Sequence, residues 1–241
     1  MSRNEPMPTA VQTWLRRALW EQVPRDHRQE PRELRRRQLV VVGFVVLGGV
    51  ALGLSLRLEP GSSWFYPATI LLASIWTVGA FVSGPLHLGR IAFRDRHARP
   101  IVTPLLLGFG LAAVFVAGAL LVRSISWLSF LEDQVVKVVD YADQGSLPIL
   151  VVITAINGIA EELFFRGAAY AAITRGPVLW TTLLYFVATL ATGNVMLAFA
   201  AVLLGAVVGL ERRASGGILG PILTHCAWSL TMLVALPLVF F

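Results

Sequence analysis

Charge and cysteine are scarce in this sequence of 241 residues. Only 14% of the residues are charged, whereas 56% are hydrophobic and the mean hydropathy is +0.71. A soluble globular domain carries about 25% charged residues, so the composition excludes an ordinary soluble protein. The single cysteine, Cys226, excludes an intrachain disulfide. The sequence also lacks an apolar run at its start and any internal repeat, so we expect neither a cleavable signal peptide nor a repeat-based transporter.

Long apolar runs are what the sequence has instead. About 20 apolar residues in a helix span a bilayer, and we expect seven such helices. Their predicted ranges are 38–56, 64–88, 101–122, 147–173, 177–192, 195–210 and 217–240. The fifth and sixth runs are short, and only the turn signal TGN at 192–194 separates them. The predicted fold is therefore an all-α polytopic membrane helix bundle of about seven transmembrane helices.

The basic residues are unevenly distributed over the predicted connections. Sixteen of the twenty lie on one predicted side, in the arm 1–37, in the loop 90–99, at Arg175 and at Arg212 and Arg213, and three lie on the other. The positive-inside rule then predicts a cytoplasmic N-terminus and an external C-terminus. Topology and anionic lipid account for the net charge of +6, so we expect membrane lipids but no nucleic acid as partners.

Three parts of the chain follow from these patterns. Residues 1–37 form a cytoplasmic basic arm, in which the apolar face of 11–23 indicates either a short amphipathic helix or a partly ordered tail. Residues 38–144 hold three transmembrane helices and an external interfacial helix within 127–142. Residues 145–241 form a core of about four transmembrane helices, in which two polar clusters lie.

The first polar cluster is the stretch NGIAEELFFRGAAY at 157–170, inside the fourth apolar run. An acidic residue at mid-helix costs about 2.5–3.5 kcal/mol on insertion scales, so charges here indicate function. Glu162 and Arg166 are one turn apart and can pair. Glu161 points about 100° away, on a face that it shares with Asn157, which can donate a hydrogen bond to it. We therefore expect Glu162 to be structural and Glu161 to be available for chemistry.

The second polar cluster is the stretch ILTHCAWSL at 222–230, in the last apolar run. His225 and Ser229 are four residues apart and share a helix face. Cys226 points elsewhere, which argues against a Cys–His nucleophile pair. A histidine alone in a membrane helix would be interpreted as a hydrogen-bonded packing residue, and only the combination with the first cluster favours a functional role.

The two clusters together resemble the motifs of the CPBP family, intramembrane endopeptidases that include CAAX prenyl proteases and bacteriocin-processing, Abi-like proteins. The family motif EExxxR, usually followed by glycine, matches EELFFRG at 161–167. The family motif HxxxN or HxxxD matches HCAWS at 225–229, except that Ser229 stands at its last position. The resemblance covers about residues 145–235.

The middle motif of the family, FxxxH, has no histidine in the corresponding run. Its nearest polar substitute is Asn194, with Thr189 and Thr192 as weaker candidates. A catalytic zinc normally has three protein ligands, and Asn and Ser are poor ones. The resemblance with these departures therefore favours a metal-free site; if a divalent metal such as zinc binds, we expect Glu161 and His225 to hold it.

The function implied by this resemblance is that of an integral-membrane endopeptidase, and the arginine-rich style and short loops of the sequence indicate a bacterial plasma membrane. Glu161 activates a water molecule, His225 carries a proton or stabilises the oxyanion, and Asn194 donates a hydrogen bond to that oxyanion. These groups are expected to be supported by Glu162, Arg166, Asn157 and Ser229.

The expected substrate is a peptide or a membrane-protein segment, with or without an attached lipid. Two alternatives stay open. Because the middle histidine is missing, the chain can be a catalytically degenerate scaffold or immunity-type protein of the same fold. Intramembrane Glu and His can also relay protons in a transporter.

Overall fold

The computed structural model describes residues 9–25, 27–55, 57–59, 62–93, 96–143 and 146–241. This part of the chain is almost entirely helical, with one short hairpin. Its elements are α1 (Ala10–Leu19), α2 (Pro31–Ser55), α3 (Phe65–Ser83), β1 (Ile91–Phe93), β2 (Arg96–Ala98), α4 (Val102–Ser124), η1 (Ser126–Leu128), α5 (Ser129–Asp143), α6 (Leu147–Glu162), η2 (Leu163–Ala169), α7 (Tyr170–Ala172), α8 (Pro177–Leu190), α9 (Val195–Ser215) and α10 (Leu219–Phe240). The predicted all-α polytopic bundle is confirmed.

Six described helices are long and apolar enough to cross a membrane: α2, α3, α4, the continuous helix Leu147–Ala172, α9 and α10. Helix α8 is equally apolar but has only 14 residues. At 1.5 Å per residue it is about 21 Å long, shorter than the roughly 30 Å of a hydrocarbon core. Each predicted apolar run thus contains one helix, and the chain is an integral multi-pass membrane protein.

The helix boundaries differ from the predicted ones at three places. Helix α2 begins seven residues before 38, so the predicted end of the basic arm lies inside a continuous helix. Helix α3 ends at Ser83, five residues before 88, and α9 continues to Ser215, five residues past 210. The turn predicted at 192–194 does separate two helices, because Gly193 has a φ of +77° and Asn194 caps α9.

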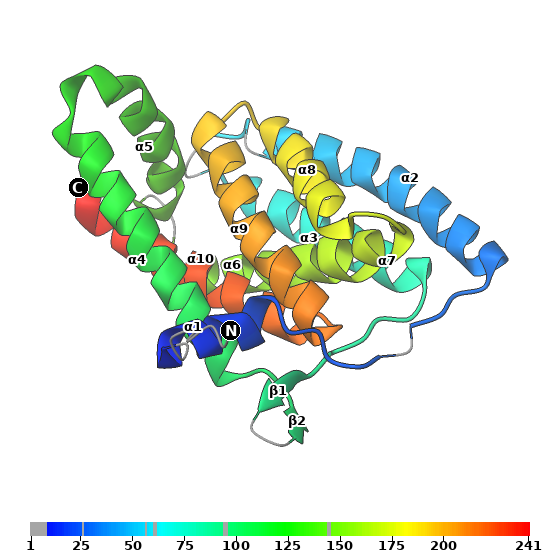
Figure 1. Cartoon of the computed structure of the whole chain (residues 1–241). Coiled ribbons are helices and arrows are strands. Elements are labelled where there is room, and N and C mark those ends of the chain that lie inside the picture. The colour runs from blue at the N-terminus through cyan, green and yellow to red at the C-terminus, as the bar shows by residue number, and fades with distance from the viewer. Residues whose placement is uncertain (1–8, 26, 56, 60–61, 94–95, 144–145) are drawn as a thin grey trace.

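The helices form two groups around a central part (Figure 1). On one side α2 packs on α3 and on α8, and on the other α4 packs on α10 and α5. Helices α6 and α9 lie between the groups, where α6 contacts both α3 and α10 and α9 contacts both α8 and α10. Small residues allow this close approach: a Cβ on Gly108 of α4 would lie 2.6 Å from the carbonyl oxygen of Thr224 in α10.

Aromatic side chains form the centre of the core beside η2. The Trp76 ring of α3 lies 4.7 Å from the Phe164 ring and 5.1 Å from the Phe165 ring, measured between centroids. All three side chains are almost fully buried. Against Trp76, the α2 chain approaches so closely that only a glycine fits, at Gly48.

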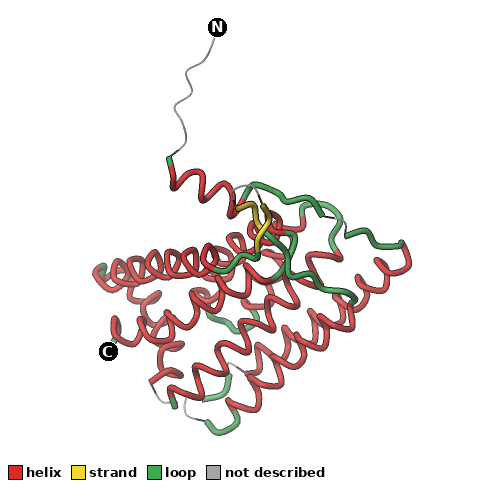
Figure 2. The backbone as a smooth tube through the Cα atoms, turned by 90° about the horizontal axis from the view of Figure 1, so that it is seen from below, coloured by secondary structure: helices red, strands yellow, loops and turns green. Residues whose placement is uncertain are grey.

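The N-terminal arm is folded onto the helix ends where described. Helix α1 begins one residue before the predicted amphipathic segment 11–23 and ends four residues before its end. It packs against α9 and β1 (Figure 2). After α1, the Val23 amide donates to the Ala214 carbonyl and the Arg25 guanidinium donates to the Arg213 carbonyl at 2.6 Å. The imidazoles of His27 and His87 stack at 3.8 Å between centroids.

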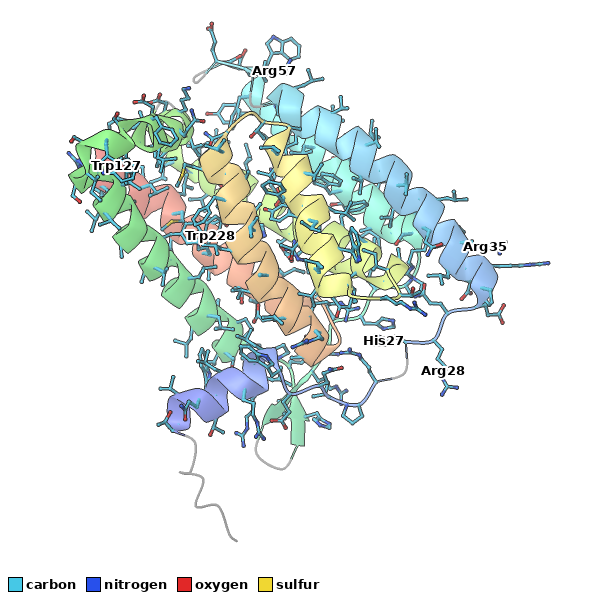
Figure 3. All side chains as sticks on the ribbon, turned by 45° about the horizontal axis from the view of Figure 1, so that its top comes forward. His27, Arg28, Arg35, Arg57, Trp127 and Trp228 are labelled. Carbon is cyan, nitrogen blue, oxygen red and sulfur yellow. The ribbon has the colours of Figure 1, made fainter. Side chains whose placement is uncertain are left out.

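The two ends of the bundle carry different residues. Figure 3 shows His27 and Arg28 at one end and Arg57 and Trp127 at the other. The helix predicted within 127–142 is present as η1 and α5 at that second end. This separation agrees with the predicted division of the connections, and the assignment of one end to the cytoplasm stays a prediction.

Candidate active site

The glutamate pair lies where one helix changes its hydrogen-bonding pattern. Glu161 and Glu162 are the last residues of α6, and η2 continues the same helix as a π-helix over Leu163–Ala169. The π-helix is rare and is found frequently at functional sites. Its wider turn is held here by Phe164 and Phe165, whose rings pack against Trp76.

Glu162 is a buried charge with two partners. The Arg166 guanidinium donates to Glu162 Oε1 at 3.2 Å, and both side chains are 0% exposed. His225 Nδ1 lies 2.8 Å from the same oxygen. Because an ionised carboxylate can only accept, we assign the proton of this contact to Nδ1. The predicted Glu162–Arg166 pair therefore forms, and it also orients the imidazole.

Glu161 has a different environment from its neighbour. Its side chain is 15% exposed, and its Oε2 lies 4.0 Å from His225 Nε2. The Tyr185 hydroxyl donates to the same Oε2 at 2.6 Å. The imidazole of His225 thus lies between two carboxylates, with Nδ1 toward Glu162 and Nε2 toward Glu161. The predicted approach of Glu161 to His225 is present, and no arginine pairs with Glu161 among the described residues.

Two other predicted site residues bond elsewhere. Asn157 donates to the Ile153 carbonyl at 3.0 Å and not to Glu161. Ser229 donates to the Cys226 carbonyl at 3.4 Å. Both bonds satisfy the side chain within its own helix, so neither residue contacts the carboxylates by a hydrogen bond in the described structure.

Asn194 is placed away from the cluster, at the start of α9. Its Oδ1 accepts from the amides of Met196 and Leu197, both at 3.0 Å, and its Nδ2 donates to the Gln134 carbonyl of α5 at 2.7 Å. Its side chain is therefore a helix cap that joins α9 to α5. The structure does not bring Asn194 to Glu161 or His225.

A known protein family matches the segment that contains this site. Residues 143–231 match the family model described as type II CAAX prenyl endopeptidase Rce1-like. These residues form an Rce1-like domain. The match includes both polar clusters, and it supports the resemblance to CPBP intramembrane proteases that the motifs predicted. No curated protein and no solved structure matches the chain.

Tyr185 is a residue of the Rce1-like domain that the sequence analysis missed. It lies on a stripe of α8 with Thr181 and Thr189, at positions i, i+4 and i+8, and all three are buried. Polar residues at this spacing share one helix face. The stripe was therefore visible in the sequence as a polar face on an otherwise apolar helix.

Arg212 was assigned to a connection, but it is buried at the end of α9. Its Nε donates to the Arg166 carbonyl at 2.7 Å, and its guanidinium lies 4.8 Å from the Tyr170 ring centroid. The preceding Glu211 is buried as well and lies beside Thr224 of α10. Arg212 supports the π-helix by bonding a carbonyl at its middle.

The donor set of the Rce1-like domain does not fit a catalytic zinc centre. No group of three or more His, Cys, Asp and Glu side chains suited to a metal occurs in the described ranges. Since His225 Nδ1 is bound to Glu162, only Nε2 and the Glu161 carboxylate face one another. A catalytic zinc normally needs three protein ligands. The described side chains therefore do not supply the ligands of a catalytic zinc, and we assign no chemical step at this site to a metal.

An apolar cavity of about 770 Å³ lies beside the domain's last helix. It is bounded by α4, α5, α9 and α10, and its lining includes Phe115, Phe199, Trp228 and Ser229. The Trp228 ring centroid is 6.1 Å from that of His225, so a side chain that lines this cavity is a neighbour of the imidazole.

Proposed function

We propose that this protein is an integral-membrane endopeptidase that hydrolyses a peptide bond with a water molecule activated by Glu161. The observation that carries the proposal is the unequal environment of the two carboxylates. Glu162 is fully buried and paired with Arg166, whereas Glu161 is partly exposed, has no arginine partner in the described structure and faces His225 Nε2 at 4.0 Å. A partly accessible acid beside a histidine is an arrangement suited to general acid–base chemistry.

The reaction needs a base, an acid and a group that stabilises negative charge. Glu161 takes a proton from water, and the water oxygen attacks the carbonyl carbon of the scissile bond. His225 Nε2, the acceptor nitrogen when Nδ1 is protonated, takes that water proton from Glu161; the resulting imidazolium stabilises the oxyanion and gives the proton to the leaving nitrogen. Collapse of the intermediate breaks the C–N bond as the proton reaches the leaving nitrogen, which gives a free carboxylate and an amine.

Glu162 and Arg166 have a supporting role in this scheme. Glu162 holds the Nδ1 proton of His225 and so keeps Nε2 directed at Glu161. Asn194 has no role in this mechanism, because its Nδ2 donates to a carbonyl of α5 and its Oδ1 accepts from an amide of α9. The negative charge of the intermediate is therefore stabilised by His225.

The substrate that we propose is a peptide or a membrane-protein segment, with or without an attached lipid, in a bacterial plasma membrane. The domain family supports a peptide bond as the target, and the partly exposed Glu161 supports access from within the bundle. The missing middle histidine favours one alternative, a scaffold of the same fold that has lost hydrolysis.

The test is a cleavage assay on purified protein reconstituted in liposomes. The probe is a library of peptides fused to one transmembrane helix, with and without a prenylated cysteine, read by mass spectrometry. We expect Glu161→Gln to lose at least about 100-fold in rate, since a general base contributes that much or more. Asp133→Asn, an exposed acid on α5, is the matched control and keeps full activity.

Two results would overturn the proposal. Cleavage by Glu161→Gln at the wild-type rate would exclude Glu161 as the base. Cleavage by neither protein, with both folded, would favour the scaffold.

A further inference from the structure

We infer that Tyr185 is a positioning residue that fixes the Glu161 carboxylate in its reactive orientation. This inference rests on the proposed function. Its starting point is the hydrogen bond from the Tyr185 hydroxyl to Glu161 Oε2 at 2.6 Å, which joins α8 to the end of α6. Bonds of about 2.5–2.7 Å are typical of a hydroxyl that donates to an ionised oxygen, and they are about twice as strong as neutral ones.

The direction of the Tyr185 hydroxyl is set by the packing of its ring. One contact is with the Phe165 ring, 5.0 Å away between centroids. The other is with the Arg166 guanidinium, which lies 4.9 Å from the Tyr185 centroid. Because Arg166 also pairs with Glu162, the phenol and the glutamate pair are held by one set of contacts.

The bond restricts the terminal torsion of Glu161. This torsion is broad in a glutamate, so an unbound carboxylate rotates easily. With Oε2 held by Tyr185 and directed at His225 Nε2, Oε1 is the oxygen left to accept a water proton. A fixed base is worth much in catalysis, since a misplacement of about 1 Å can cost about 100-fold in rate.

The location of Tyr185 agrees with this role. Helix α8 is the run in which the family motif has its histidine and this chain has none. A different helix position, Tyr185, therefore supplies the contact from α8 to the glutamate pair. The hydroxyl bonds the carboxylate, so we assign it a role that acts through Glu161.

The test compares Tyr185→Phe with Thr182→Val in the same cleavage assay. Tyr185→Phe removes the hydroxyl and keeps the ring between Phe165 and Arg166. Thr182→Val also removes a buried hydroxyl from α8, one that donates to the Val178 carbonyl at 2.8 Å. We expect Tyr185→Phe to lower kcat about 10- to 100-fold with KM unchanged, and Thr182→Val to keep the wild-type kcat.

A double-mutant cycle separates this role from simple packing. In the Glu161→Gln background, Tyr185→Phe is expected to cause no further loss of the residual rate. Equal losses in both backgrounds, or a wild-type kcat in Tyr185→Phe, would overturn the inference. An active Glu161→Gln variant would instead overturn the proposed function, so the two failures are distinguishable.

Discussion

Replacing Glu162 by glutamine tests the buried charge pair. The substitution keeps the size and shape of the side chain but removes its charge. Arg166 is 0% exposed, and Glu162 lies 3.2 Å from it as its carboxylate partner. Two further guanidinium nitrogens of Arg166, Nε and Nη2, make no hydrogen bond in the described structure. The variant would thus contain a buried cation with no compensating anion on this contact.

The expected loss of stability follows from that geometry. Breaking a buried ion pair by removing one partner costs about 3–5 kcal/mol, because the other charge stays buried. For a chain of this length, each kcal/mol lowers Tm by about 2–4 °C, so we expect a fall of about 6–20 °C. The value will be near the lower end, because the amide oxygen of the introduced glutamine can still accept one of the two bonds that Glu162 Oε1 accepts.

Thermal unfolding in detergent micelles measures this change. Glu161→Gln is the matched comparison, since Glu161 is 15% exposed and has no ion pair with an arginine in the described structure; we expect it to lose about 1 kcal/mol or less. The double variant Glu162→Met with Arg166→Met is expected to lose less stability than Glu162→Met alone or Arg166→Met alone, because it leaves no unpaired buried charge. A Glu162→Gln protein with a Tm within about 2 °C of wild type would refute the claim that Glu162 neutralises Arg166.

Two further predictions concern the helix ends and the core. Burial and the charges of Arg212 and Arg37 lower the pKa of His87 below its ordinary value of about 6.5. The neutral imidazole is therefore favoured in the folded state, and its contribution to stability is fully present above about pH 6.5. We expect Tm to fall as the pH drops from about 6.5 through the lowered pKa. A His87→Gln variant whose Tm has the same pH dependence as wild type would contradict this. Gly48→Ala places a Cβ against the Trp76 ring and is expected to cost about 1–3 kcal/mol in thermal unfolding, whereas Gly43→Ala, with open space around it, keeps the wild-type Tm.

The helices and the glutamate pair were predictable because their signals are local. Hydrophobic length alone places each apolar run, and i,i+4 spacing alone pairs Glu162 with Arg166. The turn between α8 and α9 was predicted from three residues for the same reason. The proximity of Glu161 and His225 was expected from the roles that the family resemblance gives them in one site.

The remaining parts of the site depend on contacts between helices. Asn194 was assigned to the oxyanion because it was the nearest polar residue in the run, but an asparagine just before a helix is well suited to be its cap, as here. Tyr185 was missed because its polar stripe marks a face of α8, whereas the contact of that face with Glu161 of α6 depends on how the two helices pack. Arg212 was counted as a connection residue, since no local signal shows that Tyr170 and the Arg166 carbonyl cover it.

The π-helix has a consequence for how the sequence can vary. It holds one residue more than an α-helix would need to cover the same path, so its length matters as well as its composition. Deleting a single residue within Leu163–Ala169 would let the backbone return to i→i+4 bonding with the later residues on the same path, and the wide turn beside the glutamate pair would be lost. Substitutions in this segment change one contact each, whereas a deletion between Glu162 and Arg166 would change their spacing from i,i+4 to i,i+3 and remove the wide turn together.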